Sequence, residues 1–323
     1  MVQTSATFVY RNGGIPSAIN CFLALCYVAV NVYQFVLLPL FLLPSDRGWA
    51  WTLLPLVLLT NSFWSLIHEA IHDLFHSHRG VNVCGGRILA IFFGSPFRIL
   101  RLSHLLHHKL NRLPVEGTEY FDRNACTKAQ AAPGYFFQIL VGLYLVEVLS
   151  PIYFFLPRRC LGWLKDRYLR PGSVSAILMQ NWLGAESLRE IRLDGLFTIS
   201  WLSVSFILYG KDWPVLLAAL LARGFLISFL DNAYHYETPV SDIFYAKNLR
   251  LPQPLSTLLL NFNLHGIHHI NPAISWIHLP RAFDVQGGKF HGDYFAAAWR
   301  QLRGPVALQE LPQGAPTLRI RPS

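Results

Sequence analysis

The chain is poor in charged residues. Only 14% of its 323 residues are Asp, Glu, Lys or Arg, whereas an ordinary soluble domain has about 25%. Its five cysteines form no C-x-x-C pair, which argues against a zinc ribbon, a rubredoxin-type iron site or a disulfide framework. The net charge of +9 includes no basic run with interleaved aromatic residues, so we expect no nucleic-acid partner. With 53% hydrophobic residues, the composition is typical of a multi-pass membrane protein.

Long apolar stretches predict the membrane segments. Residues 17–43 and 49–67 form one pair of spans, and residues 195–209 and 213–230 form a second pair. Residues 134–156 are also apolar, but a basic block follows them. Because basic residues favour the cytoplasmic side, we expect 134–156 to be interfacial or re-entrant rather than a crossing. About four crossings then leave the polar segments together on the cytoplasmic face.

These patterns predict a single multi-pass membrane domain over residues 1–303, with a modest soluble part. Residues 304–323 are rich in proline and polar side chains, so we expect a mobile tail there.

The 13 histidines are not scattered. Eight of them occur in an H-x-x-x-H box and two H-x-x-H-H boxes, and residues at i, i+3 and i+4 share one face of a helix. Neutral imidazole is a good ligand for zinc, iron, copper and nickel, and so many ligands predict two metal ions. The three boxes contain eight candidate ligands: His68, His72, His104, His107, His108, His265, His268 and His269.

Further candidates lie beside the boxes. Asp231 and His235 are spaced i, i+4 where the second pair of spans ends, which makes His235 a ninth candidate ligand. Glu69 lies inside the first box, and we expect it to orient an imidazole through its far nitrogen. Asp73 and Asn111 are placed to hydrogen-bond the histidines or to be solvated.

The first box, H-E-A-I-H, also matches the zinc-protease signature, in which the glutamate is the general base. Leu193-Asp194-Gly195 resembles the L-D-G element of intramembrane proteases. A membrane zinc protease needs only three metal ligands, however, and leaves both H-x-x-H-H boxes unexplained. We therefore keep it as a distant alternative.

The three boxes, in this order and spacing, resemble those of the membrane fatty acid desaturase superfamily over roughly residues 50–280. Pro272 and Trp276 also resemble its H-H-x-x-P pattern. The resemblance implies an all-α fold, with four membrane spans beneath a cytoplasmic helical cap that holds two iron ions. By motif, His235 and the eight box histidines would be the ligands. Acyl desaturases of the superfamily often have Asn where this chain has Asp231, so we expect Asp231 to alter the metal environment.

The resemblance implies an enzyme that uses O2 and two external electrons to desaturate a fatty acyl chain in the lipid bilayer. A carotenoid ketolase or hydroxylase, an acyl hydroxylase and an alkene-forming decarboxylase are alternatives on the same scaffold. The sequence has neither the H-P-G-G haem motif of cytochrome b5 nor a G-x-G-x-x-G motif after a strand. We therefore expect a separate electron donor: a ferredoxin, a rubredoxin or a cytochrome b5.

Overall fold

The computed structural model of the protein describes residues 14–117 and 119–312. Over these ranges the chain is mostly helical, as predicted. The α-helices are α2 (Ser17–Val32), α3 (Leu53–Leu58), α4 (Thr60–Ile71), α5 (Arg79–Phe93), α6 (Phe97–Leu110), α7 (Lys128–Phe137), α8 (Leu143–Phe154), α9 (Arg158–Tyr168), α10 (Val174–Trp182), α11 (Ala185–Tyr209), α12 (Trp213–Asp231), α13 (Gln253–Leu258), α14 (His265–Ile270), α15 (Leu279–Val285) and α16 (Tyr294–Arg300).

Short segments join these helices. Two have the wider π geometry, η1 (Tyr33–Leu42) and η3 (Gln138–Gly142). The 3-10 turns are η2 (Arg47–Thr52), η4 (Gly210–Asp212), η5 (Asn232–Tyr234), η6 (Phe262–Leu264), η7 (Trp276–His278), η8 (Gln301–Arg303) and η9 (Leu308–Glu310). Four two-residue strands pair in parallel, β1 (Tyr120–Phe121) with β4 (Val306–Ala307) and β2 (Leu249–Arg250) with β3 (Gly292–Asp293).

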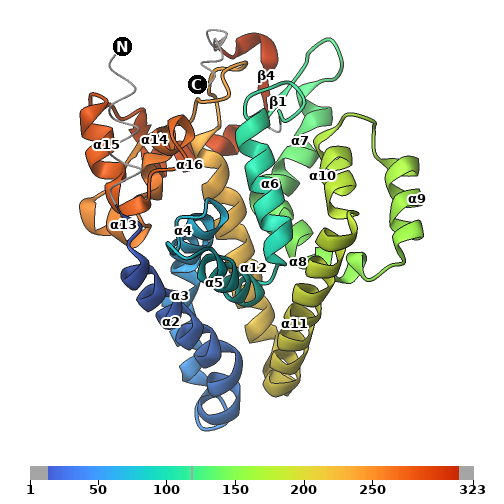
Figure 1. Ribbon diagram of the computed structural model, residues 1–323, viewed down its shortest axis with the longest axis vertical. Helices are drawn as coiled ribbons and strands as arrows, with labels where there is room; N and C mark the ends of the chain where they lie inside the picture. Colours follow the sequence, from blue (N-terminus) through green and yellow to red (C-terminus); the bar gives the residue numbers. More distant parts are fainter. Residues whose placement is uncertain (1–13, 118, 313–323) are drawn as a thin grey trace.

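Two helical hairpins reach the lower end of the molecule in Figure 1. In the first, α2 and η1 descend and α3 and α4 return; in the second, α11 descends and α12 returns. Ser17–Leu42 is long and apolar enough to cross a membrane, and so is the 50-residue stretch Ala185–Tyr234 that η4 divides. The pair Arg47–Leu58 and Thr60–Ile71, bent by 43°, passes the same test. The four arms of the hairpins contain the four stretches that the sequence predicts as crossings.

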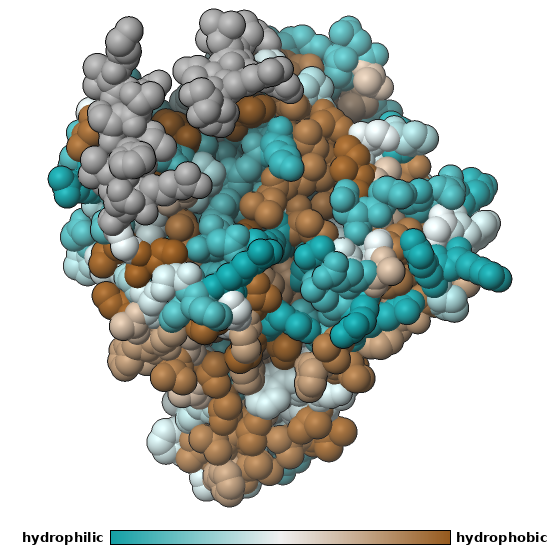
Figure 2. All heavy atoms as spheres, in the orientation of Figure 1, coloured by the Kyte–Doolittle hydropathy of each residue, from teal (hydrophilic) through white to brown (hydrophobic). Residues whose placement is uncertain are grey.

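The lower ends of the hairpins expose large apolar side chains. Phe41, Trp51 and Ile207 are 65%, 77% and 76% exposed, and Figure 2 shows hydrophobic side chains covering this end of the visible face. A soluble protein rarely exposes an apolar patch of this extent to water. Together with the candidate spans, this surface makes the chain a membrane protein.

Helix α11 begins ten residues before the apolar stretch that predicts it. Its first turns carry charge, which an apolar window excludes, but Arg192 and Asp194 bind groups on other helices. Arg192 donates from Nε to the carbonyl oxygen of Phe154 (3.0 Å) and from Nη2 to that of Leu156 (2.8 Å), so it caps the end of α8. Asp194 accepts from Nε of Arg87 on α5 at 2.8 Å.

The apolar stretch 134–156 lies in a helical segment, Lys128–Phe154, formed by α7, η3 and α8. Thr127 and Gln130 cap its start with reciprocal hydrogen bonds. By length and composition the segment could cross a membrane. In Figure 1 α8 ends well above the tips of the two hairpins. An interfacial or re-entrant position therefore remains our prediction for this segment.

Helices α5 and α6 meet at an angle of 101°. Gly94 ends α5 with a φ of +110°, a conformation that favours glycine, and Pro96 then precedes α6. The sharp bend turns α6 away from α5 and sends it upward in Figure 1, toward β1 and α7. Because α6 carries the second histidine box, this bend helps to position the site.

Part of the segment expected as a mobile tail is packed onto the cap. Val306 and Ala307 pair with β1, and the side chains of Ala307 and Leu311 are buried. Tyr236 also donates a hydrogen bond to the carbonyl oxygen of Gly304 at 2.8 Å. The polar sequence of this segment gives no sign of the packing, because strand pairing uses backbone groups and needs no run of hydrophobic side chains. Residues 313–323 lie outside the described residues.

Candidate metal centre

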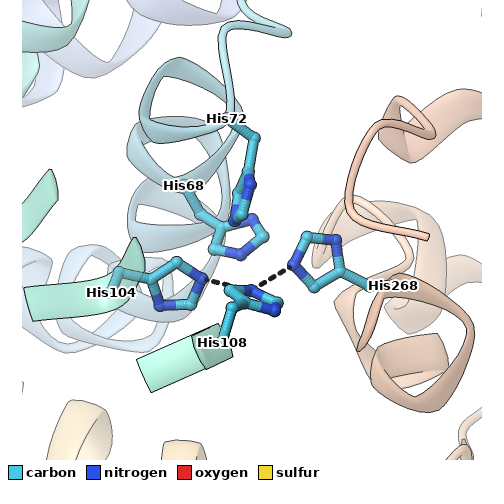
Figure 3. A group of neighbouring side chains, drawn as sticks. All are labelled: His68, His72, His104, His108 and His268. Carbon is cyan, nitrogen blue, oxygen red and sulfur yellow. Dashed lines mark hydrogen bonds between the residues drawn. The ribbon is translucent and has the colours of Figure 1, made fainter. Parts of the chain in front are cut away.

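The first group of imidazoles joins three helices. His68 and His72 come from the end of α4, His104 and His108 from α6, and His268 from α14. One ring nitrogen from each of the five can be chosen so that all lie within 4.8 Å of one another. In Figure 3 the five rings point toward a common centre from these three elements.

The second group consists of His107 on α6, His235 directly after η5, and His265 and His269 on α14. Its four candidate ligand atoms also lie within 4.8 Å of one another. The ring of His269 is centred 4.4 Å from that of His108 in the first group, so the two groups adjoin. The structure thus brings together all nine histidines that the sequence suggests as ligands.

The ring nitrogens fit a pair of metal ions. Nε2 of His108 lies 3.0 Å from Nε2 of both His104 and His268. Within the part of the chain that the structure describes, Nε2 of His68 and of His72 are buried with no hydrogen-bond partner, as is Nδ1 of His235. A buried polar atom without a partner costs free energy, and three crowded imidazoles cannot all satisfy one another through N–H···N bonds. A cation inside each group would accept these lone pairs.

Burial keeps these imidazoles in the form that binds metal. It lowers the pKa of His72 to about 3 and holds the pKa values of His235, His265, His268 and His269 well below 6.5. Neighbouring imidazoles lower the pKa values further in the last four. These five rings are therefore neutral at pH 7, and metal binding needs no release of protons from them. His107 differs, because burial lowers its pKa but the Glu116 carboxylate raises it, and the net result is a pKa above 6.5.

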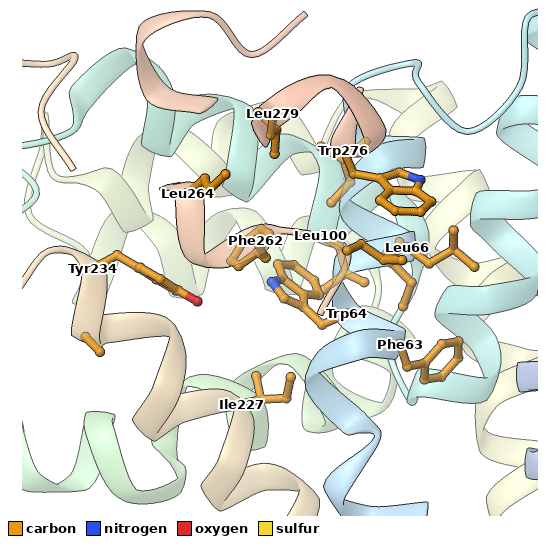
Figure 4. Packing of buried hydrophobic residues seen from close by; sticks show 14 of the residues in the cluster. Phe63, Trp64, Leu66, Leu100, Ile227, Tyr234, Phe262, Leu264, Trp276 and Leu279 are labelled. Carbon is orange, nitrogen blue, oxygen red and sulfur yellow. The ribbon is translucent and has the colours of Figure 1, made fainter. Parts of the chain in front are cut away.

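Aromatic side chains enclose the histidines. Figure 4 shows Trp64, Tyr234 and Phe262 among the packed residues of the core. The ring of Phe262 is centred 4.8 Å from that of His68, the ring of Tyr234 lies 4.7 Å from that of His265, and Trp64 is 6.3 Å from His104. These walls fix the rings and keep water away from them.

Glu116 is a site residue that the sequence pattern does not reveal. Its Oε1 lies 2.7 Å from Nδ1 of His107. Because a carboxylate accepts, Nδ1 carries the proton and Nε2 of His107 is left as the ligand atom. Glu116 follows Pro114 in a loop after α6, so no helical period connects it with His107.

Asn111 contacts the candidate ligand His269. The sequence leaves open whether Asn111 hydrogen-bonds the histidines or is solvated. Its Nδ2 lies 3.2 Å from Nδ1 of His269 and donates at 2.9 Å to the carbonyl oxygens of Ile243 and Tyr245. It therefore joins the end of α6 to the loop before the third box. Asp73 instead accepts from Asn82 and Arg101.

Glu69 has a different role from the expected one. Its Oε2 accepts from the hydroxyl of Ser275 at 3.0 Å and from the backbone N–H of Trp276 at 3.2 Å. These are its hydrogen bonds within the described part of the chain, and neither involves an imidazole. Trp276 in turn donates from Nε1 to Asn20 at 2.9 Å. Glu69 thus ties the first box to the segment after the third box, a contact that sequence spacing cannot show.

A cavity of about 790 Å³ opens onto the second group. Its polar end contains His107, His235 and His265 together with Asp231 at the end of α12. Its lining also includes residues of α6, α8 and α10, among them leucines and aromatic side chains, together with Glu147 of α8. The volume is within the range of sites that enclose a small organic ligand.

The remaining histidines in the described ranges lie outside both groups. Nδ1 of His76 accepts from the backbone N–H of His78 at 2.9 Å, and Nδ1 of His291 accepts from that of Asn248 at 3.0 Å. Asp194, from the element that resembles a protease motif, is paired with Arg87 and is also outside both groups. This placement argues against the zinc-protease alternative.

Comparison with known proteins supports the resemblance. The family model described as fatty acid desaturase matches residues 47–297, which is well over half of the chain and includes all three boxes. A search of curated proteins found no match. With its candidate spans and its histidine groups, the chain therefore belongs to the fatty acid desaturase family, a family of membrane oxidoreductases that act on fatty acyl chains.

Proposed function

We propose that the protein uses O2 and two external electrons to desaturate a fatty acyl chain, at a pair of iron ions on the cytoplasmic face of the membrane. The observation that carries the proposal is the meeting of the two buried histidine groups with the 790 Å³ cavity. Family membership supports it, since members of this family generally hold two irons.

In this proposal His68, His72, His104, His108 and His268 hold one iron, and His107, His235, His265 and His269 hold the other. Bound there, the iron pair would supply the oxidising power that hydrogen removal from an unactivated C–H bond requires. Neutral imidazoles add no negative charge to the ions, so the site keeps a high positive charge.

The chain's own residues prepare the reaction. The apolar walls of the cavity position an acyl chain and exclude water, which protects a strongly oxidising site from side reactions. Glu116 holds His107 in one tautomer and one orientation. Asp231 provides a carboxylate at the metal end of the same cavity, and we propose that it modifies the metal environment or exchanges protons there. A ferredoxin, rubredoxin or cytochrome b5 supplies the electrons.

The test is expression with a ferredoxin and its reductase in cells fed a deuterated saturated fatty acid. We expect a product with a new double bond and two irons per chain. His268→Ala should abolish turnover and reduce the iron content from two ions to one per chain. His78→Ala, at an exposed histidine outside both groups, should keep the turnover and the iron content of the wild type. A hydroxylated, ketonic or terminal-alkene product would show that the enzyme catalyses hydroxylation, ketolation or decarboxylation, respectively, and not desaturation. Full activity of a metal-free preparation would refute the proposal.

A further inference from the structure

We propose that the junction between α8 and α9, residues 152–167, binds the headgroups of anionic phospholipids at the membrane surface. This inference goes beyond the proposed reaction and does not depend on it. It concerns the surface where α8 ends and α9 begins, with α9 beside α10 at the right of Figure 1.

The side of the junction nearest α8 is suited to lipid tails. Val146, Leu149 and Ile152 are 63%, 49% and 62% exposed. Their spacing of three residues places them along one side of α8. The first two also line the 790 Å³ cavity, so the cavity and this outer surface share a side of α8. Phe155 and Leu156 continue the exposed apolar surface to the last residues before α9. Such a surface is stable only against another apolar phase.

The next residues include four exposed arginines. Arg158, Arg159, Arg167 and Arg170 are exposed, and none has an ion-pair partner within residues 14–117 and 119–312. By contrast, Arg98 pairs with Glu190 at 3.6 Å. Four arginines without carboxylates therefore face the surroundings within thirteen residues, and their charge calls for an anionic partner.

One face of α9 combines these charges with an exposed aromatic side chain. Arg159, Trp163 and Arg167 are spaced i, i+4, i+8 and lie on one side of the helix, whereas Leu161 on another side is fully buried. Trp163 is 59% exposed. Tryptophan flanked by basic residues is typical of the headgroup region, where the ring sits among polar groups and arginine reaches phosphate.

The junction is held in place by α11. Arg192 donates to the carbonyl oxygens of Phe154 and Leu156, so the turn from α8 into α9 is fixed without the side chains of Arg158 and Arg159. Those two guanidinium groups remain available to a ligand. Figure 2 shows hydrophilic side chains gathered on this side of the molecule, above its hydrophobic lower end, which is the order of a membrane surface.

Continuity with the apolar surface of α8 favours a bilayer over a soluble acidic protein as the occupant. Arginine near an anionic surface strengthens binding by roughly fivefold per residue. Removal of Arg158 and Arg159 should therefore weaken the preference for anionic lipid roughly 20- to 30-fold.

The experiment measures lipid adducts of the purified full-length protein by native mass spectrometry, with dioleoyl phosphatidylglycerol competing against dioleoyl phosphatidylcholine. The test variant is Arg158→Gln/Arg159→Gln. The matched control, Arg281→Gln/Arg303→Gln, removes the same charge at exposed arginines of α15 and η8. Hydrogen exchange of residues 155–170 in the wild-type protein, in nanodiscs with and without phosphatidylglycerol, gives a second readout that needs no variant.

We expect phosphatidylglycerol to bind preferentially to the wild type and the control, to lose that preference in the test variant, and to protect residues 155–170 from exchange. Equal binding of the two lipids by the wild type, or an unchanged preference in the test variant, would overturn the proposal. A third result would also overturn the proposal: a test variant that keeps its lipid preference but loses affinity for an acidic [2Fe–2S] ferredoxin. In that case the junction between α8 and α9 would bind a protein and not a lipid headgroup. None of these readouts requires turnover, so their failure is distinct from failure of the proposed reaction.

Discussion

Replacing Glu116 by alanine should weaken one metal position and spare the other. The carboxylate contacts His107 alone among the nine histidines, and the two side chains are only 17% and 24% exposed. A hydrogen bond to a charged partner at such a site contributes about 1.5–3 kcal/mol. We therefore expect the second group to lose metal affinity by roughly 10- to 100-fold, the usual effect of removing a carboxylate behind a metal-bound imidazole.

The assay is titration of the iron-loaded protein with a chelator, followed by the iron content of each chain. Glu116→Ala should release one iron at a chelator concentration roughly 10- to 100-fold below that needed for the wild type, and the second iron at an unchanged concentration. Glu116→Gln keeps an acceptor without its charge and should lie between the two. Glu186→Ala, at an exposed glutamate on α11, is the control. Simultaneous loss of both irons, or no loss, would refute the reasoning.

Three further predictions concern the fold that supports the site. Gly266→Ala should displace α14 and reduce bound metal, because a Cβ there would lie 2.5 Å from the carbonyl oxygen of Ala246, whereas Gly162→Ala meets no atom within 4 Å and should not. Arg87→Gln should lower the free energy of unfolding by about 3 kcal/mol, because it leaves the buried Asp194 carboxylate unpaired. Metal-free protein should lose stability as the pH falls from about 6.5 toward 3, because burial lowers the pKa of His72 to about 3 and the unfolded chain alone then takes up a proton.

Each of these has a clear contrary result. Equal metal content in the two glycine variants, measured by elemental analysis, would show that α14 adapts to a side chain. If Arg87→Gln unfolds at the wild-type temperature in detergent, the ion pair does not stabilise the bundle. A metal-free protein whose unfolding temperature is constant over that pH window would contradict burial of neutral imidazoles.

The nine histidines could be predicted because their chemistry is local. Spacings of three and four residues fix which rings share a helical face, and a cluster of ligands has no other common explanation. The same reasoning failed for Glu69, whose position inside a box suggested an imidazole partner. Its actual partners, Ser275 and Trp276, lie more than 200 residues away, and such a contact depends on tertiary packing.

Hydropathy alone did not predict the start of α11 or the strand at Val306 and Ala307. The charged first turns of α11 are helical because Arg192 and Asp194 find partners on other helices, which an apolar window cannot register. Similarly, Val306 and Ala307 form a strand through backbone hydrogen bonds, although their neighbourhood is polar and rich in proline. Glu116 lies in a loop and had no periodic signal at all.

Both metal positions draw on early and late parts of the chain. One needs His268 to complete a set that begins at His68, and the other joins His107 to His235, His265 and His269. Neither set of ligands is therefore complete until the third box has been synthesised, and an incomplete chain offers only partial sites. We therefore expect metal insertion to follow synthesis of the third box, and a chain that ends before residue 235 should keep neither ion during purification.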